Sequence, residues 1–134
     1  MLRSGRRQNF RNGSIYIDHV NGHQVFFKNG EILDKYYALD GLKGVLSWPV
    51  TGVVDQPWGS RATFLGGTIY NSPETEPHET HGIVQDAYLG HGGADGALGL
   101  PVTDVQSSGD DRSQQYQHGA ITCNVNTGHC SVQT

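Results

Sequence analysis

Hydrophobic residues in this chain occur in short runs that are separated by glycine and polar turns. A run of β-branched and aromatic residues after a glycine is typical of a β-strand, and two such runs joined by a polar turn predict a hairpin. We expect one hairpin to pair residues 13–16 with 24–27, and a second to pair 67–70 with 78–81.

A helical pattern follows each predicted hairpin. Residues 31–39 place three apolar side chains at helical spacing, and Gly41 is available to end the helix in a left-handed conformation. A counterpart over residues 83–89 is followed by Gly90. After each helix comes a Gly-x-Leu-x-x-Pro-Val-Thr pattern or its variant, in which glycine permits a tight turn and proline ends regular structure.

This order of elements recurs with a period of 52 residues. Laying residues 30–52 over 82–104 matches nine of the 23 positions, among them Tyr36 with Tyr88. A second motif, Phe-x-x-Gly-x-Ile-Tyr or its variant, occurs three times, beginning at Phe10, Phe64 and Tyr116. The chain therefore holds two full repeats and the opening part of a third.

The repeats define the expected domain organisation. We predict a single domain over residues 9–134, with repeats at 9–62, 63–114 and 115–134, preceded by a disordered basic tail over 1–8. The fold class is mainly β with short helices, in a propeller-like or solenoid arrangement of tandem repeats.

Composition and charge exclude several classes of partner. The chain is 35% hydrophobic and carries 19 glycines, which suits short strands around a thin core. Four of the nine basic residues lie in the first eleven positions, whereas all 13 acidic residues lie beyond them. A body this acidic is a poor partner for nucleic acid. Its hydrophobic runs are also too short to predict a membrane span.

The two cysteines suggest an oxidising compartment. Cys123 and Cys130 bracket a turn-like stretch, so on a hairpin they would face each other within disulfide reach. A disulfide predicts a secreted or cell-surface protein. The alternatives are two free thiols or a zinc site with His118 and His129, although the ligand spacing is unusual for zinc.

The linked motifs resemble the LGFP repeat family. Residues 64–70 read Phe-Leu-Gly-Gly-Thr-Ile-Tyr, and 96–103 read Gly-Ala-Leu-Gly-Leu-Pro-Val-Thr, with Leu100 in place of the phenylalanine that names the family. The first copy departs further, with Trp48 at that position, and the resemblance extends over residues 9–128.

This resemblance implies a function as well as a fold. LGFP repeats occur on surface and secreted proteins, notably mycoloyltransferases and peptidoglycan hydrolases of actinobacteria, where they are thought to anchor the enzyme to cell-wall polysaccharide. It implies carbohydrate binding without catalytic residues. Longer arrays of the family suggest a closed ring, so a homo-oligomer that completes the array is a further expectation.

Carbohydrate binding requires aromatic side chains beside polar ones, because sugar rings present apolar C–H faces and hydroxyl groups. Trp58, in the apparent linker 54–60, is the aromatic residue that we most expect to be exposed. The alternative is that the tyrosines belong to the core and the histidines bond to backbone. The residues predicted to bind ligand are Tyr16, Tyr70, Trp58, His23 and His78.

Catalysis is the less favoured interpretation. The chain has no Gly-x-Ser-x-Gly nucleophile motif. His78 and His81 are three residues apart on a predicted strand, where their side chains would point to opposite faces and not toward one metal. We therefore predict a non-enzymatic module without cofactor or metal. A secreted structural or protein-interaction module is the main alternative, and an enzyme with a site between repeats is a weaker one.

Overall fold

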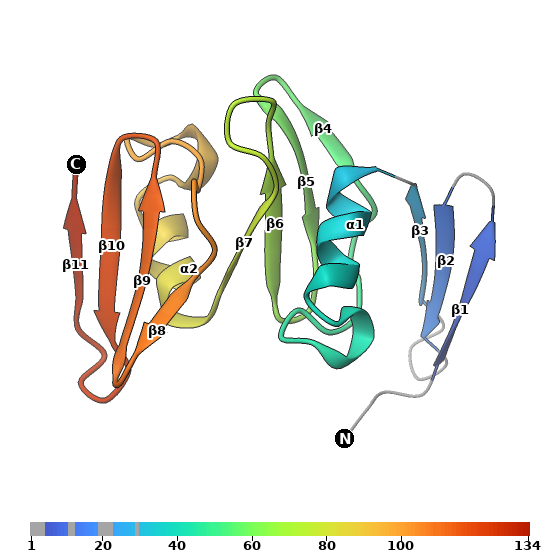
Figure 1. The fold of residues 1–134 in the computed structure, drawn as a ribbon, viewed down its shortest axis with the longest axis horizontal. Helices are drawn as coiled ribbons and strands as arrows, with labels where there is room; N and C mark the ends of the chain where they lie inside the picture. Colours follow the sequence, from blue (N-terminus) through green and yellow to red (C-terminus); the bar gives the residue numbers. More distant parts are fainter. Residues whose placement is uncertain (1–4, 11–12, 19–22, 29) are drawn as a thin grey trace.

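The computed structural model describes the backbone of residues 5–10, 13–18, 23–28 and 30–134, and the side chains of Gln24, Phe26 and residues 30–134. The described chain is mainly β (Figure 1). Its strands are β1 (Gly5–Phe10), β2 (Gly13–Asp18), β3 (His23–Lys28), β4 (Val54–Gln56), β5 (Gly59–Thr63), β6 (Gly67–Asn71), β7 (His78–His81), β8 (Gln106–Ser108), β9 (Asp111–Tyr116), β10 (Gly119–Asn124) and β11 (Cys130–Gln133). Its helices are α1 (Glu31–Ala38), η1 (Gly41–Lys43), α2 (Gly82–Gly90) and η2 (Gly93–Asp95).

The strands form three separate antiparallel sheets, with orders β1-β2-β3, β4-β5-β6-β7 and β11-β10-β9-β8. Figure 1 shows the sheets one after another along the long axis of the molecule, with α1 between the first and second and α2 between the second and third. The described sheets are open, with β4 and β7 at the edges of the second sheet.

The 52-residue period of the sequence is a period of the structure. The strands β8 and β10 begin 52 residues after β4 and β6, and η2 begins 52 residues after η1. Both predicted helices form within one residue of the expected bounds. Gly41 and Gly93 follow them with φ angles of 55° and 58°, in the left-handed region that a side chain disfavours.

Equivalent tyrosines have equivalent contacts. Tyr36 and Tyr88 are both 0% exposed. Their hydroxyl groups donate to the carbonyl oxygens of Ser47 and Gly99, each at 2.5 Å and eleven residues away. Tyr36 stacks on Phe64 at 4.6 Å, and Tyr88 stacks on the equivalent Tyr116 at 4.7 Å. The two tyrosines therefore occupy equivalent buried positions in successive repeats.

Each helix packs on the sheet that follows it in the chain, so apolar surface is buried between repeats as well as within them. The first core joins α1 to β5 and β6; its buried residues are Ile32, Leu33, Tyr36, Leu46, Trp48, Ala62, Phe64 and Ile69. The second joins α2 to β9 and β10; its buried residues are Tyr70, Val84, Tyr88, Leu98, Leu100, Tyr116, Ile121 and Cys123.

The middle sheet is covered on both faces. Ile69 belongs to the first core and Tyr70 to the second, and successive residues of a strand point to opposite faces. The last sheet differs, because Ile121 and Cys123 are buried whereas Thr122 between them is exposed. Thr122 lies 52 residues after Tyr70, so a polar residue occupies the outer face where the middle sheet has a buried tyrosine.

Both predicted hairpins form. Strand β6 pairs with β7 from Gly67 opposite His81 to Tyr70 opposite His78. Strand β2 pairs with β3 from Gly13 opposite Lys28 to Asp18 opposite His23, one residue away from the register implied by pairing 13–16 with 24–27. Within the described chain, no helix is long and apolar enough to cross a membrane.

Three sequence predictions about organisation are corrected. Residues 5–8, predicted as part of a tail, lie in β1, which pairs with β2 over its whole length. Residues 54–60, predicted as a linker, form part of the β4–β5 hairpin, because backbone pairing supplies the order that a polar sequence does not reveal. The predicted repeat boundaries at 62/63 and 114/115 fall inside sheets, which begin at β4 and β8.

Candidate functional site

A pocket of about 150 Å³ lies where the middle sheet meets the end of α2 and η2. We call it the Trp58 pocket. Its sheet wall comprises Gln56, Trp58, Arg61 and Tyr70, and its helix wall comprises Leu89, Gly92, Gly93, Ala94 and Asp95. It therefore lies at the junction of two repeats, with walls from both.

The β4–β5 hairpin places the aromatic side chain of this pocket. Pro57 and Trp58 form the two-residue connection between β4 and β5, and Gly59 follows with a φ angle of 153°. Arg61 lies opposite Tyr70 in the β5–β6 register, so both side chains project from the same face of the sheet. The hairpin, the arginine and the tyrosine thus face the helix wall together.

The aromatic rings continue from the surface into the core. The Trp58 ring is tilted by 45° against Tyr70, with centroids 5.9 Å apart. Tyr70 in turn meets Tyr88 edge to face at 5.6 Å. Tyr70 is 3% exposed, whereas Trp58 is half-buried against the second core. Trp58 is consequently anchored by buried neighbours while part of its ring stays accessible.

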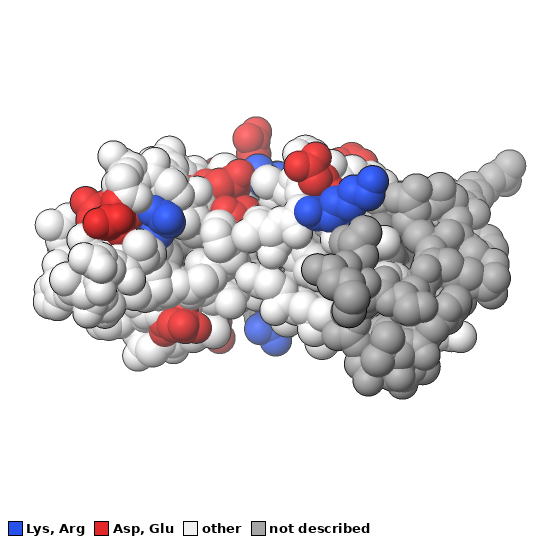
Figure 2. Space-filling model, turned by 90° about the horizontal axis from the view of Figure 1, so that it is seen from below, with Lys and Arg blue, Asp and Glu red and all other residues white. Residues whose placement is uncertain are grey.

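Opposite charges lie on the two walls. Arg61 projects from β5 and Asp95 from η2, and both are exposed. Burial raises the pKa of the Tyr70 hydroxyl, and the positive charge of Arg61 partly offsets that rise. On the face seen in Figure 2, the described basic side chains form separate patches, several of them next to acidic side chains, unlike the stripe of a nucleic-acid-binding protein.

These groups suit the recognition of hydroxylated, ring-shaped ligands. An accessible indole offers an apolar face, while the amide of Gln56, the guanidinium of Arg61 and the carboxylate of Asp95 offer hydrogen bonds in different directions. Among the described residues, no group of three or more His, Cys, Asp or Glu side chains is placed to hold a metal ion.

The structure brings together two of the five predicted binding residues, Trp58 and Tyr70. We expected Trp58, more than any other aromatic residue, to be exposed, and this is wrong: its ring is half-buried, whereas Phe26 and Tyr37 are 51% and 39% exposed. Tyr16 and His23 lie in β2 and β3, and their side chains fall outside the described residues. His78 is the register neighbour of Tyr70 but does not line the pocket.

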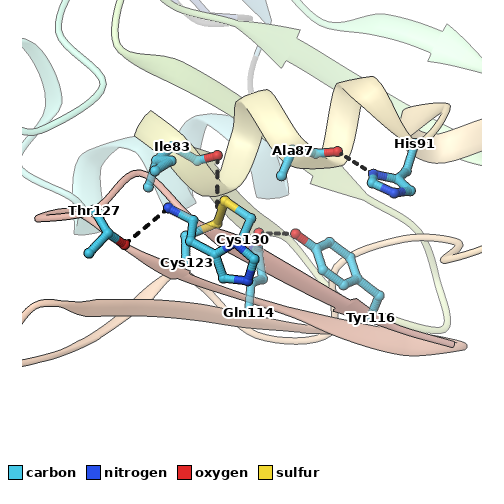
Figure 3. The surroundings of a disulfide bond; sticks show 9 residues. Ile83, Ala87, His91, Gln114, Tyr116, Cys123, Thr127 and Cys130 are labelled. Carbon is cyan, nitrogen blue, oxygen red and sulfur yellow. Dashed lines mark hydrogen bonds between the residues drawn. A yellow bond between two sulfur atoms is a disulfide. The ribbon is translucent and has the colours of Figure 1, made fainter.

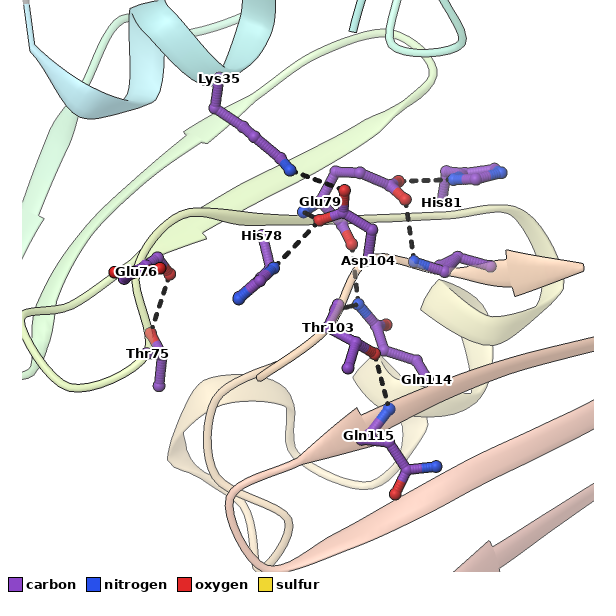
Figure 4. A network of polar contacts seen from close by, with 11 residues as sticks. Lys35, Thr75, Glu76, His78, Glu79, His81, Thr103, Asp104, Gln114 and Gln115 are labelled. Atoms are coloured by element: carbon purple, nitrogen blue, oxygen red, sulfur yellow. Dashed lines mark hydrogen bonds and ion pairs between the residues drawn. The ribbon is translucent and has the colours of Figure 1, made fainter. Parts of the chain in front are cut away.

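His78 belongs instead to a polar network at the edge strand β7 (Figure 4). Its Nδ1 lies 3.1 Å from Oδ1 of Asp104, and Lys35 of α1 donates to Oδ2 of the same carboxylate at 2.6 Å. The backbone N–H of Glu79 also donates to Asp104, at 3.2 Å. Burial alone would raise the pKa of Asp104, but the Lys35, Glu79 and His78 hydrogen bonds lower it overall.

Glu79 joins this network to the next sheet. It is 3% exposed, and its Oε1 accepts the backbone N–H of Val105 at 3.0 Å. Its Oε2 lies 2.5 Å from Nδ1 of His81, and this hydrogen bond raises the pKa of His81 against the opposing effect of burial. The backbone oxygen of Glu79 accepts from Gln114 Nε2 at 2.7 Å. All of these groups have structural partners, which suits a connection between repeats.

Two further grooves lie near α1. The larger, of about 490 Å³, is lined by Glu31, Asp34, Lys35, Ala38, Ser72, Pro73, Glu76 and Pro77. It has the greater volume but no aromatic side chain among its lining residues. The second, of about 320 Å³, shares Glu31 with it and also lacks an aromatic lining residue. The smaller Trp58 pocket is therefore the better candidate for stacking a ring.

Sequence reasoning missed Gln56, Arg61 and Asp95. Gln56 lies inside the segment that we predicted as a linker, and Arg61 directly follows it. The signal that would have found them is the dipeptide Pro57-Trp58 followed by glycine, which suits a tight turn between two strands. Asp95 lies in the glycine-rich stretch after α2, which gives no pattern of its own.

The predicted disulfide is present between Cys123 and Cys130 (Figure 3). These residues are direct partners in the β10–β11 register. Cys123 is fully buried in the second core, and its Sγ lies 3.9 Å from the carbonyl oxygen of Ile83 at the start of α2. The bond therefore holds the edge strand β11 to a core strand.

Comparison with known proteins agrees with the internal repeat. The profile of the LGFP repeat matches the chain twice in tandem, over residues 2–44 and 46–96. None of the curated proteins compared with the chain matches it. The two matched segments cover more than half of the sequence, and each contains a predicted hairpin and the helix that follows it. The chain belongs to the LGFP repeat family.

Proposed function

We propose that this protein is a non-catalytic module that binds carbohydrate of a cell wall or cell surface at the Trp58 pocket. The observation that carries the proposal is the half-buried indole of Trp58, supported by Tyr70 and faced by an amide, a guanidinium and a carboxylate. A sugar ring stacked on the indole would leave its hydroxyl groups within reach of these polar side chains.

The polar set of the pocket favours binding over glycoside cleavage. Glycosidases generally use two carboxyl groups that flank the scissile bond. The lining of the Trp58 pocket includes one carboxylate, Asp95. The buried carboxyl group of Glu79 is already bonded to His81 and Val105. We therefore place the binding energy in stacking and hydrogen bonds and assign no reaction.

Extracellular placement is part of the same proposal. The Cys123–Cys130 disulfide supports an oxidising compartment, and the family membership supports an association with cell walls. We further propose that the repeats stack as a solenoid and that their junctions present equivalent pockets. In such an array, affinity per site is low and strength arises from several sites on one polymer.

Titration with soluble arabinogalactan and peptidoglycan fragments, followed by tryptophan fluorescence, tests the proposal. Trp48 is 5% exposed, so a ligand-dependent signal should come mainly from Trp58. We expect a dissociation constant of about 0.1–1 mM per site for the chain. Trp58→Ala should weaken binding at least tenfold, measured by calorimetry, whereas Trp58→Phe should retain part of the affinity because it keeps an aromatic face.

Circular dichroism of each variant provides the control for folding. A folded protein that gives no response to either glycan at millimolar concentration would contradict the proposal and favour a protein-interaction module. Unchanged affinity of Trp58→Ala would show that glycan binds elsewhere on the chain.

A further inference from the structure

The Trp58 pocket carries a charge pattern that narrows its ligand class. We propose that Arg61 makes it a site for acidic sugars, whose ring stacks on Trp58 while the carboxylate pairs with the guanidinium. This inference rests on the proposed function, because it specifies the ligand of the same pocket.

Arg61 is free to bind an anion. Among the described residues, the ion pairs are Lys35–Asp104, His78–Asp104 and His81–Glu79, and none of them involves Arg61. Asp95 lies on the opposite wall of the pocket without an ion pair to Arg61. The arginine side chain is exposed, so it keeps its donors available to a ligand.

The geometry places that charge beside the stacking platform. Arg61 is the direct cross-strand neighbour of Tyr70, and Tyr70 supports the Trp58 ring. The guanidinium is a planar donor that binds a carboxylate through two parallel hydrogen bonds. A uronic acid on the indole would therefore direct its carboxylate toward β5 and its hydroxyl groups toward Gln56 and Asp95.

The negative charge on the helix wall sets the orientation. Asp95 accepts hydrogen bonds from sugar hydroxyls but would repel a carboxylate placed against η2. With a cation on one wall and an anion on the other, a ring with one acidic substituent has a single favourable orientation. A neutral sugar ring has no charged edge, so the charges of the two walls do not favour one of its orientations over another.

The arginine–tyrosine pair recurs in the first repeat but not in the last. In the backbone register of the first sheet, Arg7 lies opposite Tyr16, as Arg61 lies opposite Tyr70. In the last sheet, Ser113 lies opposite Thr122. The pair thus occurs in the two sheets with a tyrosine at this position, and it is absent from the sheet with the polar outer face.

A matched pair of probes tests the inference. Trigalacturonic acid and its fully methyl-esterified form differ in charge but share their ring. We expect the intact chain to bind the acid about tenfold more tightly than the ester at low salt, measured by calorimetry, because a charge-assisted bidentate pair is lost in the ester. In Arg61→Gln the ratio of the two dissociation constants should fall to about one, and Arg61→Lys should keep an intermediate ratio.

Arg112→Gln serves as the matched control, because it removes a partly exposed arginine from β9 of the last sheet, away from the Trp58 pocket. It should leave the ratio unchanged. Equal binding of acid and ester by the unmodified chain, binding of neither, or an unchanged ratio in Arg61→Gln would overturn the inference. Since wall glycans are titrated separately, binding of those glycans together with any of these results would leave the proposed function standing.

Discussion

Glu79 illustrates at the residue scale how this chain accommodates a buried carboxyl group. An unpaired buried charge costs several kcal/mol, on the order of the whole stability of a small domain. Here Oε1 accepts the Val105 N–H and Oε2 accepts from His81 (Figure 4). His81 lies in β7 itself, whereas Val105 lies directly before β8. The two hydrogen bonds of this carboxyl group therefore also connect the middle sheet to the last one.

Protonation of His81 should make stability depend on pH. The Glu79 hydrogen bond raises the pKa of His81 in the folded state above 6.5. The stabilisation of the folded state by the protonated His81–Glu79 pair is therefore fully present below pH 6.5 and is lost as pH rises through the folded-state pKa of His81. We expect the free energy of unfolding, measured by urea denaturation, to fall by about 1 kcal/mol across this range, a modest amount because the imidazole is partly exposed.

His81→Asn should flatten this alkaline limb, and His118→Asn, which replaces an exposed histidine, should retain it. An equal decline in His81→Asn would assign the effect to another group.

At the acidic end, the pKa of Asp104 is lowered below 3.8, so its contribution to the stability of the folded state is present above pH 3.8 and is lost as pH falls through the folded-state pKa.

Part of the candidate site was predictable from single residues. Trp58 and Tyr70 were predicted because a tryptophan beside a turn and a tyrosine that ends a repeated motif are recognisable without a structure. Arg61 and Asp95 were not, since their significance depends on the β5–β6 register and on the packing of η2 against the middle sheet. The contact of His78 with Asp104 was not predictable either, because Asp104 lies 26 residues away in sequence.

At the scale of elements, β7 is an edge strand of the middle sheet, so one side of its backbone has no neighbouring strand. An exposed edge leaves unpaired backbone groups that invite association with other chains. Side chains satisfy them here: Asp104 accepts the N–H of Glu79, and Gln114 donates to its backbone oxygen. The next repeat therefore covers the edge of the preceding one without adding a strand to it.

Gln114 should be the more costly of two adjacent glutamines to replace. It is 0% exposed, donates to the carbonyl oxygens of Glu79 and Thr103, and accepts from the Tyr116 hydroxyl at 2.9 Å. Gln114→Ala leaves these groups unpaired, so we expect a loss of about 3 kcal/mol in urea denaturation. Gln115→Ala, an exposed neighbour on the same strand, should cost less than about 0.5 kcal/mol. Equal losses would contradict the role assigned to Gln114.

The elements themselves were predicted unevenly. Apolar residues identified β6 and both helices, whereas β7, which reads His-Glu-Thr-His, was predicted as the hairpin partner of β6. Strands β4 and β8 are three residues long and largely polar, and β5 and β9 are also rich in polar residues. Their order comes from pairing with neighbours, which leaves little trace in a hydrophobic pattern.

At the scale of the molecule, stability arises from contacts between successive repeats. Because each helix packs on the following sheet, the middle sheet is buried on both faces, whereas the last sheet has one polar face. Nearest-neighbour arrays of this kind open most readily at a unit with a single neighbour. The Cys123–Cys130 bond lies in that last sheet, where it joins the edge strand β11 to β10.

Reduction of the disulfide should therefore loosen the last sheet more than the rest of the array. Closing so short a loop contributes about 2.5 kcal/mol in the chain-entropy model, and we expect the free energy of unfolding to fall by about that amount. Hydrogen exchange read by mass spectrometry should show lost protection in β9–β11, while amides of β5–β7 change less.

Intact mass confirms reduction, and a Cys123→Ala/Cys130→Ala variant should reproduce the effect without reductant. Equal loss of protection in both sheets would mean that the array unfolds as one cooperative unit, and unchanged protection in β9–β11 would mean that packing of β10 on α2 holds the last sheet without the bond.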